Sequence, residues 1–173
     1  SVVVAMDDLC VERDESPLAE NGQHDCERVY ALDIPKLNGD LKSLFAGDEV
    51  ELPKFDFTTG KSNPSGVKVK MAPNDVLIME GIHALNPVLT KEIEEEKKFK
   101  VYASALTTIS IDENNYVSTT DLRLIRRIVR DNNFRNYSAE ATILRWPSVV
   151  RGENKNIFPF QENADAMFNS SLI

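Results

Sequence analysis

The segment Asp75-Val-Leu-Ile-Met-Glu-Gly-Ile-His-Ala-Leu-Asn-Pro87 contains the clearest strand signal in the chain. Four apolar residues run without alternation into Glu80, and Gly81 follows at once. Such a run is typical of a strand that is buried on both faces of a parallel sheet. A carboxylate at the end of this strand would lie at the edge where α/β proteins bind ligands, and Gly81 would allow a sharp turn there. The alternative is a core strand that ends at an ordinary polar residue.

The first residues of the chain repeat this pattern. Residues 1–6 are apolar and largely β-branched, which predicts another buried strand, and Asp7 and Asp8 follow it. Two buried strands that deliver acids to the same edge of a sheet would bring those acids together. We therefore expect Asp7 and Glu80 to lie near one another.

Further elements complete an α/β pattern. Asp33 as N-cap, Pro35 in the first turn and Gly47 as the C-terminal glycine bound a predicted helix. A charged helix is expected over 89–100, and further strands over 100–106 and 164–168. Segments 50–57 and 67–71 alternate apolar and polar residues around a loop at 58–66, which predicts an antiparallel hairpin flap over 50–71. We expect one domain, 1–173, with a mostly parallel sheet flanked by helices.

An arginine-rich helix is predicted to begin at Asp121, after a cap at Thr119 or Thr120. Its arginines stand at i, i+3, i+4 and i+7, on one side of the helix: Arg123, Arg126, Arg127 and Arg130. Like charges at this spacing repel one another, so the pattern indicates an anion opposite them; pairing with acids elsewhere in the chain is the alternative. A hinge-like polar loop at 131–137 should follow, and then a helix from Ala139 that Pro147 ends.

Composition limits the classes of function. The net charge is −8, which argues against non-specific nucleic-acid binding, and no apolar run approaches the roughly 18 residues of a membrane span. The two cysteines fit a reducing compartment, so we expect a cytoplasmic protein. His24 and His83 stand alone and are expected to be structural. Carboxylates combined with clustered arginines fit phosphoryl transfer better than metallohydrolase or acyl-transfer chemistry.

Several segments together carry a resemblance to a known family. They are Ala5-Met-Asp-Asp8, Tyr30-Ala-Leu-Asp33, Leu52-Pro-Lys-Phe-Asp-Phe-Thr-Thr-Gly-Lys-Ser62, residues 74–87, Ser118-Thr-Thr-Asp-Leu-Arg-Leu-Ile-Arg-Arg-Ile-Val-Arg-Asp131, Arg145-Trp-Pro-Ser148 and residues 157–165. With them the chain resembles the phosphoribulokinase/uridine kinase family of P-loop kinases. Within it, the chain is most similar to the uridine kinase-like domain that follows a threonyl-tRNA-synthetase-like region in longer proteins.

The resemblance implies ATP and Mg²⁺ as cofactors and a nucleoside or sugar as substrate. By position, Asp7 matches the general base and Glu80 the acid near Mg²⁺. Asp25 falls near the acid that holds the ribose hydroxyls. The implied nucleoside-binding hairpin supplies Phe55, Asp56 and Phe57. Arginines that lead into the lid over the ATP phosphates correspond to Arg126, Arg127 and Arg130, and the resemblance implies that this lid spans 131–155 and includes Arg135.

The chain departs from the family in two places. Gly60, with Lys61 beside it as a substrate-binding candidate, stands where uridine kinases usually carry His. A different nucleoside or a phosphorylated sugar therefore remains open as the acceptor. The family's Gly-x-x-x-x-Gly-Lys-Ser/Thr loop is also missing, and Gly60-Lys61-Ser62 is predicted to be hairpin loop instead.

We therefore expect the P-loop strand to lie upstream of Ser1 and a closing helix to lie beyond Ile173. The chain would then be a fragment without kinase activity of its own, from which a central strand is missing. The alternative function is that of a non-catalytic nucleotide-binding or interaction module, a degenerate kinase. Exposed parallel strand edges favour pairing with another chain, so a homo-oligomer is also expected.

Overall fold

The fold was analysed in a computed structural model, which describes residues 1–18, 24, 28–104, 110 and 112–170. The predicted substrate residue Asp25 lies outside these ranges. The longer elements, in chain order, are β1 (Val2–Ala5), α1 (Ile34–Ala46), β2 (Val50–Asp56), β3 (Lys61–Val69), β4 (Leu77–Glu80), β5 (Val101–Ser104), α2 (Thr119–Phe134), α3 (Ala139–Asn156) and β6 (Ala166–Asn169). Short 3-10 turns lie between them: η1 (Met6–Leu9), η2 (Arg13–Glu15), η3 (Val29–Ala31), η4 (Glu95–Lys97) and η5 (Phe158–Asn163). The predicted α/β class is confirmed.

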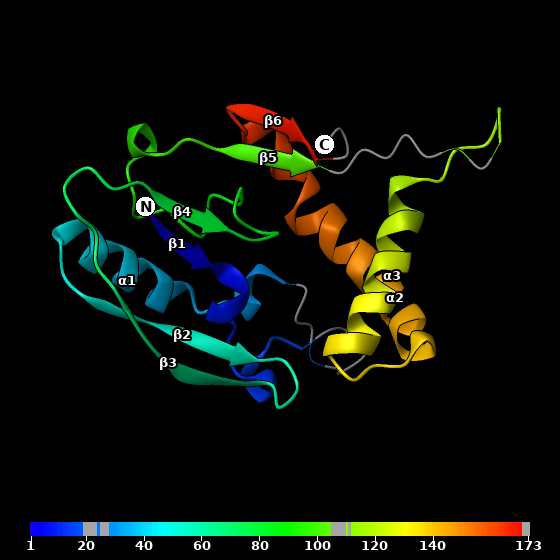
Figure 1. Ribbon diagram of the computed structural model, residues 1–173, viewed down its shortest axis with the longest axis horizontal. Helices are drawn as coiled ribbons and strands as arrows, with labels where there is room; N and C mark the ends of the chain where they lie inside the picture. Colours follow the sequence, from blue (N-terminus) through cyan, green and yellow to red (C-terminus); the bar gives the residue numbers. More distant parts are fainter. Residues whose placement is uncertain (19–23, 25–27, 105–109, 111, 171–173) are drawn as a thin grey trace.

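The strands form three pairs. β1 lies parallel to β4, β5 lies parallel to β6, and β2 and β3 form an antiparallel hairpin. In Figure 1, β5 and β6 lie beyond β4, with their arrows in a similar direction. The parallel pairing is as predicted, although the described strands form separate pairs and not one continuous sheet.

Helix α1 covers one face of the β1–β4 pair. The Asp33 carboxylate accepts a hydrogen bond from Lys36 N at 2.9 Å, and Gly47 ends the helix with a φ of 85°, both as predicted. A core cluster joins the two elements and consists of Val2, Val4, Met6, Leu9, Val29, Leu32, Leu37, Leu41 and Leu89. The opposite face is open, since Val3 is 55% exposed and Ile78 48%. Burial of both faces was therefore a wrong prediction for these strands.

The hairpin is confirmed, but its turn is shorter than predicted. β3 begins at Lys61, directly across from Asp56 in the register, so most of the predicted 58–66 loop is strand. The Asp56 carboxylate accepts hydrogen bonds from Thr58 N and from the Thr59 hydroxyl, both at 2.8 Å, which closes a tight turn. Gly60 ends the turn with a φ of 74°. Lys61 and Ser62 therefore stand on a strand and not in a loop.

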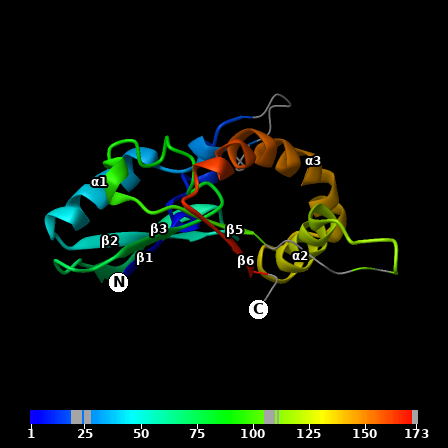
Figure 2. The same cartoon turned by 90° about the horizontal axis from the view of Figure 1, so that it is seen from above.

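Helices α2 and α3 lie apart from α1 in both views (Figures 1 and 2). The C-terminal end of α2 reaches the hairpin, because Arg135 there contacts the Phe57 ring. The cap of α2 is Ser118, and the helix continues to Phe134, through the start of the predicted hinge. α3 also continues beyond Pro147, its predicted end. Val149 and Glu153, which follow Pro147, are buried, and this packing outweighs the local effect of the proline.

The predicted helix over 89–100 is absent from the structure, which has turns and η4 there. Two backbone carbonyls of this segment are bonded to side chains instead: Asn38 Nδ2 donates to Leu89 O at 3.0 Å, and Lys98 Nζ donates to Thr90 O at 2.9 Å. Glu92 and Glu96 would also stand four residues apart on one face of a helix, where like charges repel. Across the described ranges, no helix combines the length and apolar character that crossing a membrane would require.

Candidate functional site

Asp7 and Glu80 lie at one edge of the β1–β4 pair. Ala5 pairs with Glu80 in the parallel register, and Asp7 follows Ala5 by two residues. A cavity of about 40 Å³ lies beside them and is lined by Met6, Asp7, Cys10, Arg28, Leu32, Ile82 and His83. Both carboxylates are exposed, and neither forms an ion pair with a residue that the structure describes. The register confirms that the two strand ends come together, as the sequence indicated.

Gly81 allows this close approach. A Cβ atom at Gly81 would lie 2.8 Å from Met6 Cβ, and Met6 is only 2% exposed. The residue after Glu80 therefore has no room for a side chain. Gly81 holds the end of β4 against η1, the turn that carries Asp7.

The carboxylates at this edge fit a magnesium site in which substrate phosphates and water supply the remaining ligands. Within the described ranges, no three His, Cys, Asp or Glu side chains are grouped closely enough to hold a metal ion. Mg²⁺ in phosphoryl-transfer sites is commonly held by one or two carboxylates together with substrate phosphates and water. Glu80, exposed at the strand end, matches that kind of donor set.

Asp8 was not a site candidate, yet it joins this edge to the hairpin. Its carboxylate accepts hydrogen bonds from Lys54 Nζ at 3.0 Å and from Phe55 N at 3.3 Å. β2 is thereby fixed beside the turn that carries Asp7. The Asp-Asp sequence was the available signal that one of the two carboxylates could be structural. Asp8 binds the hairpin, whereas Asp7 forms no ion pair among the described residues.

The predicted substrate residues of the hairpin differ in their surroundings. Phe55 is buried and meets Phe57 edge to face, with ring centroids 5.1 Å apart. The Asp56 carboxylate is engaged in the turn, and hydrogen bonds from the Thr59 hydroxyl and Thr58 N lower its pKa. Lys61 is exposed at the start of β3.

Arg13 in η2 clasps the hairpin turn. Its guanidinium donates to Phe57 O at 2.8 Å, and its backbone N–H donates to Gly60 O at 2.9 Å. A Cβ atom at Gly60 would lie 2.9 Å from Arg13 Cβ, so the arginine fills the place where a side chain would stand. The family's usual His would not fit at Gly60 without displacing Arg13.

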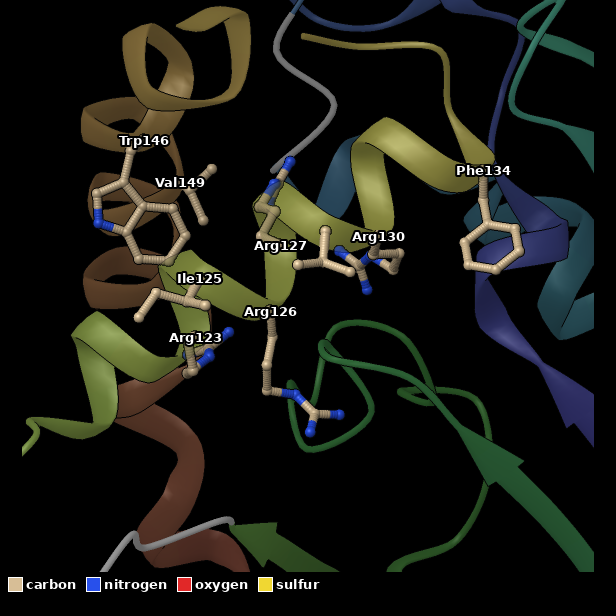
Figure 3. A pocket seen from close by; sticks show the side chains of 9 residues that line it. Arg123, Ile125, Arg126, Arg127, Arg130, Phe134, Trp146 and Val149 are labelled. Atoms are coloured by element: carbon tan, nitrogen blue, oxygen red, sulfur yellow. The ribbon is translucent and has the colours of Figure 1, made fainter. Parts of the chain in front are cut away.

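A larger cavity of about 460 Å³ lies between α2 and α3 (Figure 3). Its lining consists of Arg123, Ile125, Arg126, Arg127, Val129, Arg130, Phe134, Trp146 and Val149. Three of the four predicted phosphate-binding arginines therefore face one space, together with Arg123. Arg135, the fourth, is not part of the lining.

Acids partly neutralise these arginines, so the alternative of internal pairing also applies. Arg123 pairs with Glu153 at 2.6 Å, and Arg127 Nε lies 3.3 Å from Asp131 Oδ2. Arg130 Nε is 3.8 Å from Asp131 Oδ1, a looser contact. Arg126 forms no ion pair with any residue in the described ranges. Arg126 and Arg130 therefore retain the most donors for an outside anion.

Arg130 also connects the arginine cavity to the sheet edge electrostatically. Burial lowers its pKa, and the neighbouring charges of Arg135 and Arg127 lower it further, while Asp131 and Asp7 act in the opposite direction. Asp7 therefore lies within the electrostatic range of Arg130.

Arg135 lies on the hairpin side of α2. Its Cζ atom is 4.5 Å from the centre of the Phe57 ring, and its Nη1 is 3.5 Å from Asp131 Oδ1. Sequence reasoning missed Asp131, which it placed at the start of a loop. The Arg127–Asp131–Arg135 spacing of four residues was the available signal.

Comparisons with known proteins identify the family of the chain. The model of the phosphoribulokinase/uridine kinase family matches residues 1–171. The chain belongs to this family. It is 31% identical over 156 residues to a uridine kinase of Staphylococcus haemolyticus (strain JCSC1435), with 88% of this chain and 67% of that protein covered. A uridine kinase of Staphylococcus aureus (strain JH9) is 30% identical over 141 residues, which cover 80% of this chain and 59% of that protein.

The fold also agrees with that of a solved structure. A structure described as a possible uridine kinase from Bacillus stearothermophilus has a TM-score of 0.53 and 19% sequence identity. The match covers 97% of this chain and 71% of that one. At this level of identity the likeness concerns the fold alone, and it supports the P-loop kinase fold class.

Proposed function

We propose that this chain supplies the acceptor side and the lid of a kinase domain, which transfers a phosphoryl group from ATP to a hydroxyl of a nucleoside or sugar. The observation that carries the proposal is the parallel register that brings the strand ends of Asp7 and Glu80 together, in a chain that also has a cavity lined by arginines. Membership of the phosphoribulokinase/uridine kinase family supports it, as do relatives named uridine kinase.

Asp7 is assigned the role of general base. Its carboxylate is exposed at the sheet edge and has no cation paired to it among the described residues, so it is available to accept the proton of an attacking hydroxyl. Glu80, across the register from Ala5, would hold Mg²⁺ with phosphate oxygens and water. Bound Mg²⁺ would offset the charge that builds up on the phosphoryl oxygens during transfer.

The arginines of α2 are assigned to the phosphates of ATP. Arg126 and Arg130 have the most uncommitted donors, so they would make the first contacts. Arg127 lines the same cavity and is held by Asp131. Guanidinium groups suit this role because their planar donors match phosphate oxygens in pairs.

The hairpin is assigned to the acceptor. Phe57 offers aromatic surface and packs edge to face on the buried Phe55, whose N–H donates to Asp8 beside the proposed base. Asp56 shapes the turn and Lys61 follows it, while Asp25 stays a prediction from the resemblance. Arg13 takes up the space beside Gly60, where uridine kinases usually carry His. We therefore expect the acceptor to be a nucleoside other than uridine, or a phosphorylated sugar.

The test uses a protein extended upstream through any P-loop in its reading frame, assayed for ATP turnover against nucleosides and sugar phosphates. Asp7→Asn should lower kcat by at least about 100-fold, because general-base catalysis is typically worth 10² to 10⁴. Asp14→Asn, an exposed acid in η2, is the matched control and should retain activity. A loss of less than about threefold in Asp7→Asn would exclude the base assignment.

A second candidate is a nucleotide-binding module without catalysis. The ion pairs of Arg123 and Arg127 favour it, because they tie up part of the arginine face in the absence of any nucleotide. In that case the extended protein would bind ATP without turning it over for any acceptor in the panel. Turnover that depends on Asp7 excludes this candidate.

A further inference from the structure

The buried carboxylate of Asp131, near the end of α2, is surrounded by three arginines. Asp131 is 4% exposed, and its oxygens lie 3.3 Å from Arg127 Nε, 3.5 Å from Arg135 Nη1 and 3.8 Å from Arg130 Nε. The buried Thr142 hydroxyl of α3 is 3.5 Å from Oδ2. Arg127 and Arg130 line the cavity, whereas Arg135 does not. Asp131 therefore contacts two arginines that line the cavity and one arginine that points to another part of the molecule.

That other part is the acceptor hairpin. The Arg135 guanidinium stacks on the Phe57 ring at 4.5 Å, and Phe57 O accepts a hydrogen bond from Arg13 at 2.8 Å. The backbone at the end of α2 is fixed by the same residue, because Arg135 N and Tyr137 N both donate to Asp131 O. A continuous series of contacts therefore runs from the cavity through Asp131 and Arg135 to the hairpin turn.

We propose that Asp131 is a positioning residue, which transmits the binding of phosphates at the arginine cavity to the acceptor hairpin through Arg135 and Phe57. This inference rests on the phosphate site of the proposed function. It adds a coupling between the two halves of the substrate site, so that occupation of one changes the order of the other.

The physical basis is competition for the arginines. An anion in the cavity takes N–H donors from Arg127 and Arg130, which now face Asp131. The buried carboxylate still requires a cation, since an unpaired charge in such a place is strongly unfavourable. Arg135 is the partner that remains, so its guanidinium becomes more firmly held above Phe57. The hairpin turn should then open less often.

The test measures backbone amide hydrogen exchange at residues 57–61 with and without inorganic tripolyphosphate. Trp146 lines the cavity and is the sole tryptophan of the chain, so its fluorescence reports binding of the probe directly. In the wild-type chain, saturating tripolyphosphate should slow exchange in the turn by at least about fivefold, the lower end of usual coupling between sites.

Variants separate this coupling from general stability. Asp131→Asn, Arg135→Gln and Phe57→Leu should each abolish the slowing of exchange. Phe57→Leu leaves both the buried carboxylate and Arg135 in place and should still bind the probe, so it serves if Asp131→Asn fails to fold. Arg135→Gln should bind the probe more weakly, because Asp131 then lacks its remaining cation when the anion is bound. The matched control is Arg145→Gln, because Arg145 stacks on Tyr137 at 4.9 Å near the same corner without contacting Asp131. It should keep the full effect.

Each result is decisive. Probe binding in the wild type without slower exchange overturns the coupling and leaves the phosphate site intact. An absence of any probe binding overturns the phosphate site, and the coupling with it. If tripolyphosphate slows amide exchange equally in the wild type, Arg135→Gln and Phe57→Leu, the coupling does not pass through Asp131 and Arg135.

Discussion

At the level of single residues, Gly81 allows the end of β4 to lie close to the end of β1. Its missing side chain leaves room for the buried Met6, and a Cβ would approach Met6 Cβ to 2.8 Å. The sequence predicted a turn glycine here, which is correct. The closeness of Met6 could not be predicted, because it depends on the parallel pairing of β1 with a strand more than seventy residues away.

Gly81→Ala should destabilise the chain by about 1–3 kcal/mol, the usual range for overpacking a filled core. Gly39→Ala is the matched control, since Gly39 lies in α1 with no atom within 4 Å of the added Cβ. That control should stabilise the chain by up to about 1 kcal/mol, because alanine favours helix. Urea denaturation of both variants gives the comparison, and equal effects would contradict the proposed close approach.

Asp56 should make stability depend on acid pH. Hydrogen bonds from the Thr59 hydroxyl and Thr58 N lower its pKa in the folded chain, whereas the unfolded carboxyl titrates near about 3.9. Its contribution is therefore fully present above the unfolded pKa and is lost as pH falls through the folded pKa. Asp56→Asn and Thr59→Ala should both flatten the decline of stability below about pH 4. Slopes equal to that of the wild type in denaturation at several pH values would refute this role.

At the level of elements, local signals were sufficient where they agreed with one another. Asp33, Pro35 and Gly47 marked the bounds of α1 because capping is a local interaction. Local signals were insufficient at Pro147, because α3 continues beyond it and buries Val149 and Glu153. They also failed at Leu89, whose carbonyl is bound by the distant Asn38. The pairing of Arg127 and Arg135 with Asp131 follows the spacing of four residues along α2 and is local, whereas the contact of Asp131 with the buried Thr142 depends on the packing of α3.

Asp33→Ala should destabilise the chain by about 1 kcal/mol, because Lys36 N loses its acceptor at the start of α1. Asp40→Ala is a suitable comparison, since Asp40 belongs to the same helix but only pairs with Lys36 on the surface. Its effect should stay near about 0.3–0.5 kcal/mol. Thermal or urea unfolding that ranks the two variants in the opposite order would exclude the capping role.

At the level of the whole molecule, apolar surface remains open on both the sheet and the helices. Val3 and Ile78 are exposed on the β1–β4 pair, and Ile125, Val129 and Phe134 are exposed on α2. The strand pattern predicted burial of both faces, because an uninterrupted apolar run is typical of strands inside a parallel sheet. The structure shows which faces the described residues leave uncovered, which no residue count could reveal.

We expect the chain to self-associate through this surface, as exposed strands commonly do. Sedimentation velocity should show a mass that rises with protein concentration. Ile78→Lys, on the open face of β4, should shift the distribution toward monomer. Val67→Lys, at an exposed position of the hairpin, should not. A chain that stays monomeric at every concentration would count against association by this face.

The contact between Met6 and Gly81 also has an oxidative consequence. Conversion of a thioether to its sulfoxide needs solvent access and introduces a polar oxygen. Met167 is 65% exposed and should react at once with mild peroxide, whereas Met6 can react only in molecules whose strand ends have separated. Peptide mass spectrometry of the two methionines would therefore time the opening of the site, with Met167 as an internal clock for the oxidant.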